Sequence, residues 1–176
     1  MDDSDWPSGY DHKMLNQMSL QDRYAPNSIC FGCGPQNLKG LRIKSFSTDS
    51  GEVVAEFMAE PHHEAFPGMV NGGIIGALLD CHSNWTAAYH LMLASGQTEA
   101  PPCTVTGDFH VKLRAPTPSN QKIKLKAKPV EIQADRAKIE AQLFTVNSDG
   151  TEKLTATCSG TFVAVKPGHP AYHRWG

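Results

Sequence analysis

A single carboxylate in an otherwise uncharged stretch is the first residue that could do chemistry. Asp80 is the only Asp, Glu, Lys or Arg between Ala65 and Thr98, although 19% of the 176-residue chain is charged. A carboxylate on a helix shielded from water is costly unless it is paired or used. We therefore expect Asp80 to act as a general base or nucleophile. The alternative is a structural acid, hydrogen-bonded to the backbone or to Asn84.

Paired glycines are the second chemical feature. Gly72 and Gly73 follow Asn71, whose side chain can cap the first turn of a helix. Backbone amides at a helix N-terminus can hold a developing oxyanion or a phosphate, with the positive end of the helix dipole behind them. The alternative is that the glycines only allow tight packing at a turn. Asn71 and Asp80 face opposite sides of the helix, so a site that uses both needs two chains.

The cysteines suggest a metal or redox site only weakly. Cys30 and Cys33 have the spacing of half a zinc site. No second pair has ligand spacing, because Cys81, Cys103 and Cys158 are isolated in the sequence. We expect a packed loop with no metal and no cofactor, with a metal site or a redox pair as alternatives.

One long helix must position Asp80 and the glycines. It is expected to run from Asn71 to about Ala94, before Ser95-Gly96. One stripe of it is apolar: Ile74, Leu78, Trp85, Tyr89 and Met92. The opposite face carries small or polar residues: Gly76, Ala77, Asp80, Ser83, Asn84 and Ala87. We expect a sheet on one side of this helix and a second copy of the chain on the other.

Strand patterns flank the helix on both sides. Two strands are expected before it, near residues 41–44 and 52–58, and four after it, at 103–114, 123–132, 139–143 and 154–165. Along 103–114 the strict alternation places Val105, Gly107, Phe109, Val111 and Leu113 on one face and Thr104 and Thr106 on the other. A phase change beside Pro129 indicates a β-bulge. The expected fold is α+β, with one long central helix wrapped by an antiparallel sheet of about six strands.

The domain organisation is simple. Residues 1–28 are expected to form an N-terminal arm with a short helix within Asp11–Arg23, residues 29–166 the single domain, and residues 167–176 a C-terminal tail. The formal net charge of −2 gives no electrostatic attraction to nucleic acid or to an anionic membrane. The N-terminus lacks an apolar signal segment, and the five cysteines are an odd, sparse set, so we expect a cytoplasmic protein.

Four segments together resemble a known family. They are CFGCGPQNLKGLRI (30–43), PHHEAFPGMVNGGIIGALLD (61–80), VTGDFHVKLRAPTP (105–118) and ATCSGTFV (156–163). These segments are similar to the hotdog-fold acyl-CoA thioesterases of the phenylacetate-pathway (PaaI-like) type, over roughly residues 29–165. The resemblance implies hydrolysis of an acyl-CoA, without a metal, by a homodimer or a dimer of dimers.

The resemblance also implies roles for particular residues. The amide of Gly72 would polarise the thioester carbonyl, Asp80 of the partner chain would be the nucleophile or base, and Thr106 would position water. The family usually has His where this chain has Asn71, and an amide cannot shuttle a proton. His82 is our candidate for the missing imidazole, and a buried core histidine is the alternative.

Further residues are expected to contact substrate. Where many family members carry a polar amide this chain has Ala65, and the neighbouring Glu64 could replace that amide. The substrate-binding residues expected from the resemblance are Gly73, Ala65, Phe66, Ser83, Val105 and Gly107.

Four lysines recur on one face of a predicted strand, at positions 122, 124, 126 and 128. We expect a solvated face, with a landing site for coenzyme A phosphates as the alternative.

Two alternative functions remain: a non-catalytic acyl-CoA binding or sensing protein, and a hotdog dehydratase.

Overall fold

The fold is α+β and places one long helix against one antiparallel sheet. The computed structural model describes residues 18–173 and Trp175. The helix is α3 (Gly72–Ala94), and the sheet contains β1 (Lys44–Ser47), β2 (Val53–Phe57), β5 (Thr104–Leu113), β6 (Lys122–Ile132), β7 (Arg136–Val146) and β8 (Glu152–Ala164). Smaller elements are α2 (Leu20–Tyr24), the 3₁₀ turn η2 (Pro61–His63), β3 (Glu64–Phe66) and β4 (Met69–Val70). No helix in the described part of the chain is long and apolar enough to span a membrane.

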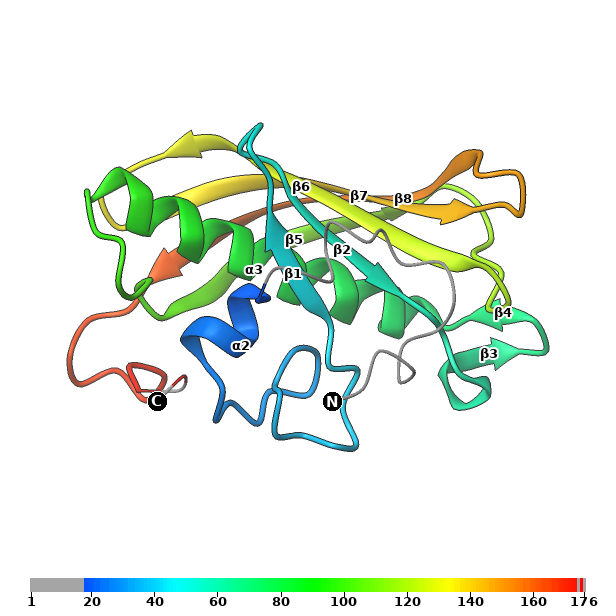
Figure 1. Cartoon of the computed structure of the whole chain (residues 1–176), viewed down its shortest axis with the longest axis horizontal. Helices are drawn as coiled ribbons and strands as arrows, with labels where there is room; N and C mark the ends of the chain where they lie inside the picture. Colours follow the sequence, from blue (N-terminus) through cyan, green and yellow to red (C-terminus); the bar gives the residue numbers. More distant parts are fainter. Residues whose placement is uncertain (1–17, 174, 176) are drawn as a thin grey trace.

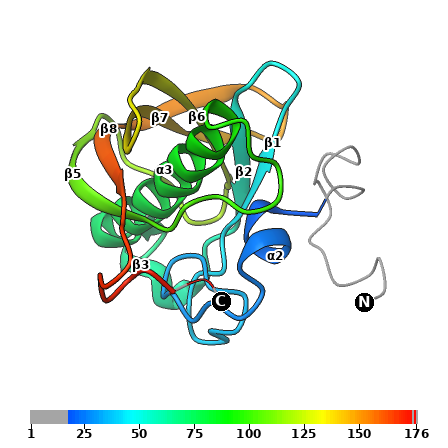
Figure 2. The same cartoon turned by 90° about the vertical axis from the view of Figure 1, so that its left-hand side faces the viewer.

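The six-stranded sheet has the order β1-β2-β6-β7-β8-β5, and neighbouring strands are antiparallel. Figures 1 and 2 show the sheet curving over α3, which lies across its inner face. This arrangement is the hotdog fold expected from the sequence. Its order leaves β1 and β5 at the two edges, and β5 is the longer of them.

The core forms where the apolar stripe of α3 meets alternate residues of the central strands. Ile123 and Leu125 of β6 and Ile139 and Leu143 of β7 are fully buried, as is Leu78 of α3. Because successive side chains of a strand point to opposite faces, these alternate positions all face the helix. Removing this apolar surface from water is the main stabilising contribution, about 25 cal/mol per Å².

The ends of α3 agree with the expected caps. The Asn71 side chain accepts a hydrogen bond from the Gly73 N–H at 2.7 Å, and Gly96 follows the helix with a φ of 72°. The C-terminal segment returns to the helix, where Trp175 stacks on Trp85 with ring centroids 4.4 Å apart. Trp175 is 6% exposed, so this residue of the expected tail packs against the domain.

Three expectations about elements change. The first strand begins at Lys44 and not near Leu41. The described helix of the arm is Leu20–Tyr24, and the expected segment before residue 18 lies outside the described residues. A short hairpin, β3–β4, stands directly before α3, where no strand was expected. Its strands are three and two residues long, too short to produce a visible alternation.

The register of the sheet shifts at three places, one of them between Leu143 and Phe144 of β7, and the other two bear on the expectations. The register shift between Pro129 and Glu131 confirms the bulge expected beside Pro129. A second shift lies between Thr106 and Asp108, where Gly107 is the extra residue against β8. The expected assignment of faces along β5 is therefore wrong. Thr106 shares the inner face with Phe109, because an inserted residue reverses the alternation after it.

Candidate active site

An open groove lies between the first turns of α3 and the second half of β5. Its volume is about 420 Å³. We call it the glycine groove, and it is lined by Gly72, Gly73, Gly76, Ala77, Asp80, Phe109, Val111 and Leu113. Phe109 and Leu113 are 45% and 56% exposed. The groove therefore combines one carboxylate with an apolar wall that water still reaches.

Asp80 is held by a hydroxyl from β5. The Thr106 Oγ1 donates a hydrogen bond to Asp80 Oδ1 at 2.7 Å. Asp80 is half-buried, so the carboxylate is neither locked in the core nor freely solvated. A carboxylate fixed by one hydroxyl at the edge of an apolar groove can accept a proton from water or attack a carbonyl.

The start of α3 offers a backbone donor to the same groove. Gly72 and Gly73 are exposed, and Asn71 accepts from the Gly73 N–H and not from that of Gly72. The Gly72 amide belongs to the first turn, where an N–H has no acceptor within the helix. The helix dipole adds positive potential there, so the Gly72 N–H can stabilise an oxyanion.

Gly72 and Asp80 lie far apart along the axis of α3. Both line the glycine groove, whereas Asn71 caps the helix and is absent from the lining. The two positions are about two turns apart, or ~12 Å along the axis. One carbonyl cannot lie within hydrogen-bond distance of the Gly72 amide and also within reach of Asp80 of the same chain. The expectation of a site shared between two chains therefore depends on this separation and not on helical phase.

His82 lies in the core and not in the glycine groove. It is fully buried, with Nδ1 2.9 Å from Ser45 Oγ and Nε2 3.1 Å from the Val53 carbonyl oxygen. Burial lowers the pKa of His82 to about 4. The structure does not bring His82 together with Asp80 in the glycine groove, and it supports the alternative of a satisfied core histidine.

The remaining expected residues lie around the groove and not in its lining. Glu64 accepts a hydrogen bond from Ser119 Oγ, and Phe66 is 63% exposed on the β3–β4 hairpin just before α3. Ala65 lies between them in β3. Ser83 is fully buried, and Val105 and Gly107 flank Thr106 in β5. Of the expected substrate-binding residues, only Gly73 lines the groove.

The apolar wall of the groove was missed from the sequence. Strict alternation predicts Phe109, Val111 and Leu113 on the face opposite Thr106. The one available signal was Gly107, because a glycine inside a strand pattern often marks a bulge. The small residues Gly76 and Ala77 were expected on the open helix face and do lie there, whereas Ala87 is covered by its own chain.

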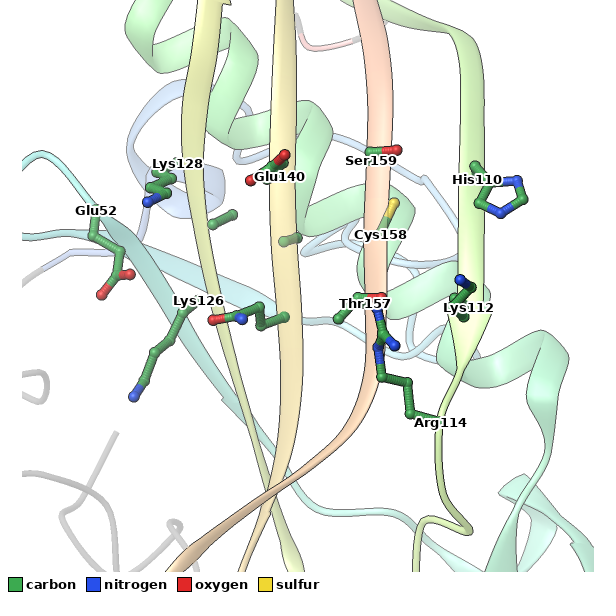
Figure 3. A pocket seen from close by; sticks show the side chains of 13 residues that line it. Glu52, His110, Lys112, Arg114, Lys126, Lys128, Glu140, Thr157, Cys158 and Ser159 are labelled. Atoms are coloured by element: carbon green, nitrogen blue, oxygen red, sulfur yellow. Dashed lines mark hydrogen bonds between the residues drawn. The ribbon is translucent and has the colours of Figure 1, made fainter.

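A second hollow lies on the opposite face of the sheet (Figure 3). We call it the outer-face hollow; its volume is about 430 Å³, and it is lined by Glu52, His110, Lys112, Arg114, Lys126, Ala127, Lys128, Glu140, Ala141, Gln142, Thr157, Cys158 and Ser159. Lys124 and Lys126 both bind Glu152, at 2.8 and 2.7 Å, and lower the pKa of its carboxyl group. Lys122 pairs with Glu56, so three of the four lysines are held in ion pairs, and only Lys128 is exposed as a solvated face would require.

Three cysteines meet beside α3, near Ala77 and Asp80 of the groove. The Sγ atoms of Cys30, Cys33 and Cys81 all lie within 4.8 Å of one another. The Sγ atoms of Cys30 and Cys81 are 3.8 Å apart. The expectation that Cys81 is isolated is therefore wrong in space, because the 28–34 loop packs directly on the helix. A side chain at Gly32 would place its Cβ 2.3 Å from Cys81 Sγ, so this contact requires glycine.

Comparison with known proteins gives structural relatives. No family model and no curated protein matches the sequence. A solved thioesterase superfamily protein from Shewanella loihica PV-4 is 27% identical, covers 70% of this chain and 91% of that one, and superposes with a TM-score of 0.54. The PaaI protein of the Escherichia coli phenylacetic acid degradation operon is 15% identical, over 72% of this chain and 81% of its own, with a TM-score of 0.55. A structure described as an apo-hexameric acyl-CoA thioesterase is 16% identical, over 69% and 74%, with a TM-score of 0.55.

Proposed function

We propose that this chain hydrolyses an acyl-CoA thioester to the free acid and coenzyme A. The premise is its fold, which is the hotdog fold of PaaI and other thioesterase-superfamily proteins. The observation that carries this proposal is the Thr106–Asp80 hydrogen bond at the wall of the glycine groove. A fixed carboxylate, a first-turn amide and an apolar surface are what hydrolysis of an apolar thioester needs.

In the proposed reaction, Asp80 takes a proton from water as the water oxygen attacks the thioester carbonyl. The Gly72 N–H of the other chain stabilises the oxyanion. Collapse of the tetrahedral intermediate breaks the C–S bond, and the proton goes to the coenzyme A sulfur. In the nucleophilic variant, an Asp80 oxygen attacks the carbonyl, the C–S bond breaks and coenzyme A leaves as the thiolate; water then hydrolyses the resulting mixed anhydride, which restores the Asp80 carboxylate. Thr106 holds the carboxylate in both variants.

The two-chain site is supported by the exposed edge of the sheet. β5 is an edge strand, and the apolar residues Phe109 and Leu113 next to the groove are exposed. A long apolar edge strand is suited to pairing with a second copy. Such a pairing would cover the groove and bring Gly72 of one protomer toward Asp80 of the other. We propose a homodimer as the minimal unit, with a dimer of dimers as the larger possibility.

Asn71 has a structural task in this scheme. Its side chain is engaged with the Gly73 N–H, which fixes the start of α3 and leaves the Gly72 amide to the substrate. Hydrolysis by this route needs no imidazole. A hotdog dehydratase, which would need His and a carboxylate together, has less support because no histidine is among the groove-lining residues.

A non-catalytic acyl-CoA binding protein is the second candidate. The same absence of histidine from the groove lining favours it over a dehydratase. The test is release of free thiol from a panel of short-chain, long-chain and aromatic acyl-CoAs. Thiol release with saturation kinetics supports hydrolysis. Tight binding of the panel without thiol release contradicts it and supports the binding protein.

A further inference from the structure

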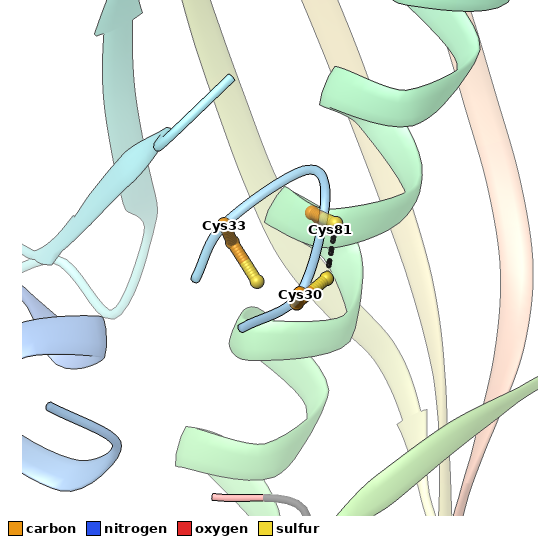
Figure 4. Close-up of side chains that lie close together, drawn as sticks. All are labelled: Cys30, Cys33 and Cys81. Carbon is orange, nitrogen blue, oxygen red and sulfur yellow. Dashed lines mark hydrogen bonds between the residues drawn. The ribbon is translucent and has the colours of Figure 1, made fainter. Parts of the chain in front are cut away.

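Three thiols from separate parts of the chain converge beside α3. Cys30 and Cys33 come from the loop before β1, and Cys81 comes from the helix (Figure 4). Their Sγ atoms lie within 4.8 Å of one another, and the Cys30 and Cys81 atoms are 3.8 Å apart. Among the described residues, this is the group of His, Cys, Asp or Glu whose ligand atoms are close enough to share a metal ion.

The spacing matches the edge of a metal tetrahedron. A Zn–S bond is about 2.3 Å, so two sulfur atoms of a tetrahedral site are separated by ~3.8 Å. The Cys30–Cys81 distance already has this value. A disulfide needs ~2.05 Å and would leave one of the three thiols unpaired. The arrangement suits three ligands of one ion better than one covalent pair.

Cysteine binds metal ions as the thiolate, so metal binding at a thiol cluster releases protons. A divalent cation bound among the three sulfur atoms would replace their protons and turn all three into thiolate ligands.

Surrounding groups support thiolate ligands. The indole N–H of Trp85 donates to Cys33 Sγ at 3.3 Å, and Trp85 is itself buried and stacked on Trp175. N–H donors to ligand sulfur atoms orient the ligands of metal sites and tune their charge. Gly32 lets the loop approach Cys81 as closely as it does, since a Cβ there would clash with the sulfur atom.

We propose that Cys30, Cys33 and Cys81 bind a zinc ion through three thiolates, with water in the fourth position. Soft thiolate ligands favour zinc over magnesium, calcium and manganese among the common cellular divalent ions. Cys33 and Cys81 are buried, whereas Cys30 is half-buried, so water reaches the site beside Cys30. The ion would tie the 28–34 loop to α3 at the residue that follows Asp80. This inference is independent of the proposed hydrolysis.

The test is metal content together with a cobalt spectrum. Protein produced with zinc and purified without chelator should contain about one zinc per chain. Cobalt(II) should replace the zinc and give the intense visible bands of a tetrahedral thiolate site. In Cys81→Ser and Cys30→Ser, zinc affinity should fall at least ~100-fold, because even changes outside the ligand set cost 10–100-fold. Cys103→Ser, a half-buried cysteine outside the cluster, is the matched control and should keep the ion.

Two results would overturn the proposal. One is substoichiometric zinc in wild-type protein, with no cobalt bands and no change in melting temperature when zinc is added to chelated, reduced protein. The other is a Cys30–Cys81 or Cys30–Cys33 disulfide in freshly isolated protein, found by mass spectrometry. The cobalt spectrum needs only wild-type protein, so the proposal stays testable if the serine variants fail to fold.

Discussion

The glycine groove and the outer-face hollow are nearly equal in size, about 420 and 430 Å³, and β5 contributes to both. Their chemistry is opposite. The groove has one carboxylate, held by Thr106, against glycines and exposed apolar side chains. The hollow is lined by four cationic side chains and two glutamates, and one of the cations, Lys126, is paired with Glu152. Volume does not distinguish the two regions as binding sites, whereas the type and pairing of their side chains do.

The bulge at Gly107 separates these two regions. After it, Phe109 and Val111 face the groove, while His110 and Lys112 face the hollow. One inserted residue thus assigns alternate side chains of a single strand to an apolar wall and to a polar one. If the groove is the active site, substitutions of residues that face the groove should reduce activity far more than substitutions at neighbouring positions that face the hollow.

The largest effect is expected at Asp80. Asp80→Asn preserves the shape and removes the proton acceptor, so kcat should fall by ~10²–10³. The measurement is thiol release under saturating acyl-CoA. Asp49→Asn, in the exposed turn between β1 and β2, is the control and should keep full activity. A lower melting temperature with retained activity per folded molecule would show instead that Asp80 is structural.

The next effect is expected at Gly72, and it tests the two-chain site. Gly72→Pro removes the N–H at the first helical position, where proline is well tolerated. Asn71 already has the extended ψ of 136° that a residue before proline prefers. Activity should fall strongly while circular dichroism stays unchanged.

Mixing the two inactive variants sharpens this test. Refolded mixtures of Asp80→Asn and Gly72→Pro should contain mixed dimers with one site intact. Random pairing of equal amounts makes half of the dimers mixed, each with one of two sites working, which predicts about a quarter of wild-type activity. Mixed dimers that form and remain inactive would exclude a site shared between Gly72 and Asp80.

A smaller effect is expected from paired substitutions on the two faces of β5. Phe109→Lys places a charge on the apolar wall and should shift the protein toward monomers in light scattering, with loss of activity. His110→Lys, the adjacent position on the hollow side, should keep the assembly. If both variants show the same assembly and activity, the two faces of β5 do not differ in function.

The smallest effect is expected in the outer-face hollow. Lys112→Glu and Lys128→Glu should change KM for acyl-CoA by less than ~3-fold, since charges exposed to solvent contribute little. An increase in KM of more than ~10-fold with unchanged kcat would place the coenzyme A phosphates on the outer face, provided that the increase becomes smaller at high salt.

Much of the fold was predictable because its signals are local. The Asn71 cap, the end of α3 at Ser95-Gly96 and the bulge beside Pro129 all follow from residues within one turn or one strand. The contact between Asp80 and Thr106 was expected only through the resemblance, since the two residues lie on different elements. The β3–β4 hairpin was missed because its strands are too short to show a period.

Local residue patterns suffice to predict the helix, the alternation of the strands and the position of Asp80 among uncharged residues, because these features depend on side-chain type and on interactions a few residues apart. The side of β5 that faces the groove depends instead on long-range pairing, because the bulge at Gly107 exists through pairing with β8. The contact between Cys81 and Cys30, 51 positions apart, likewise requires the packing of a loop on α3, which brings their sulfur atoms together.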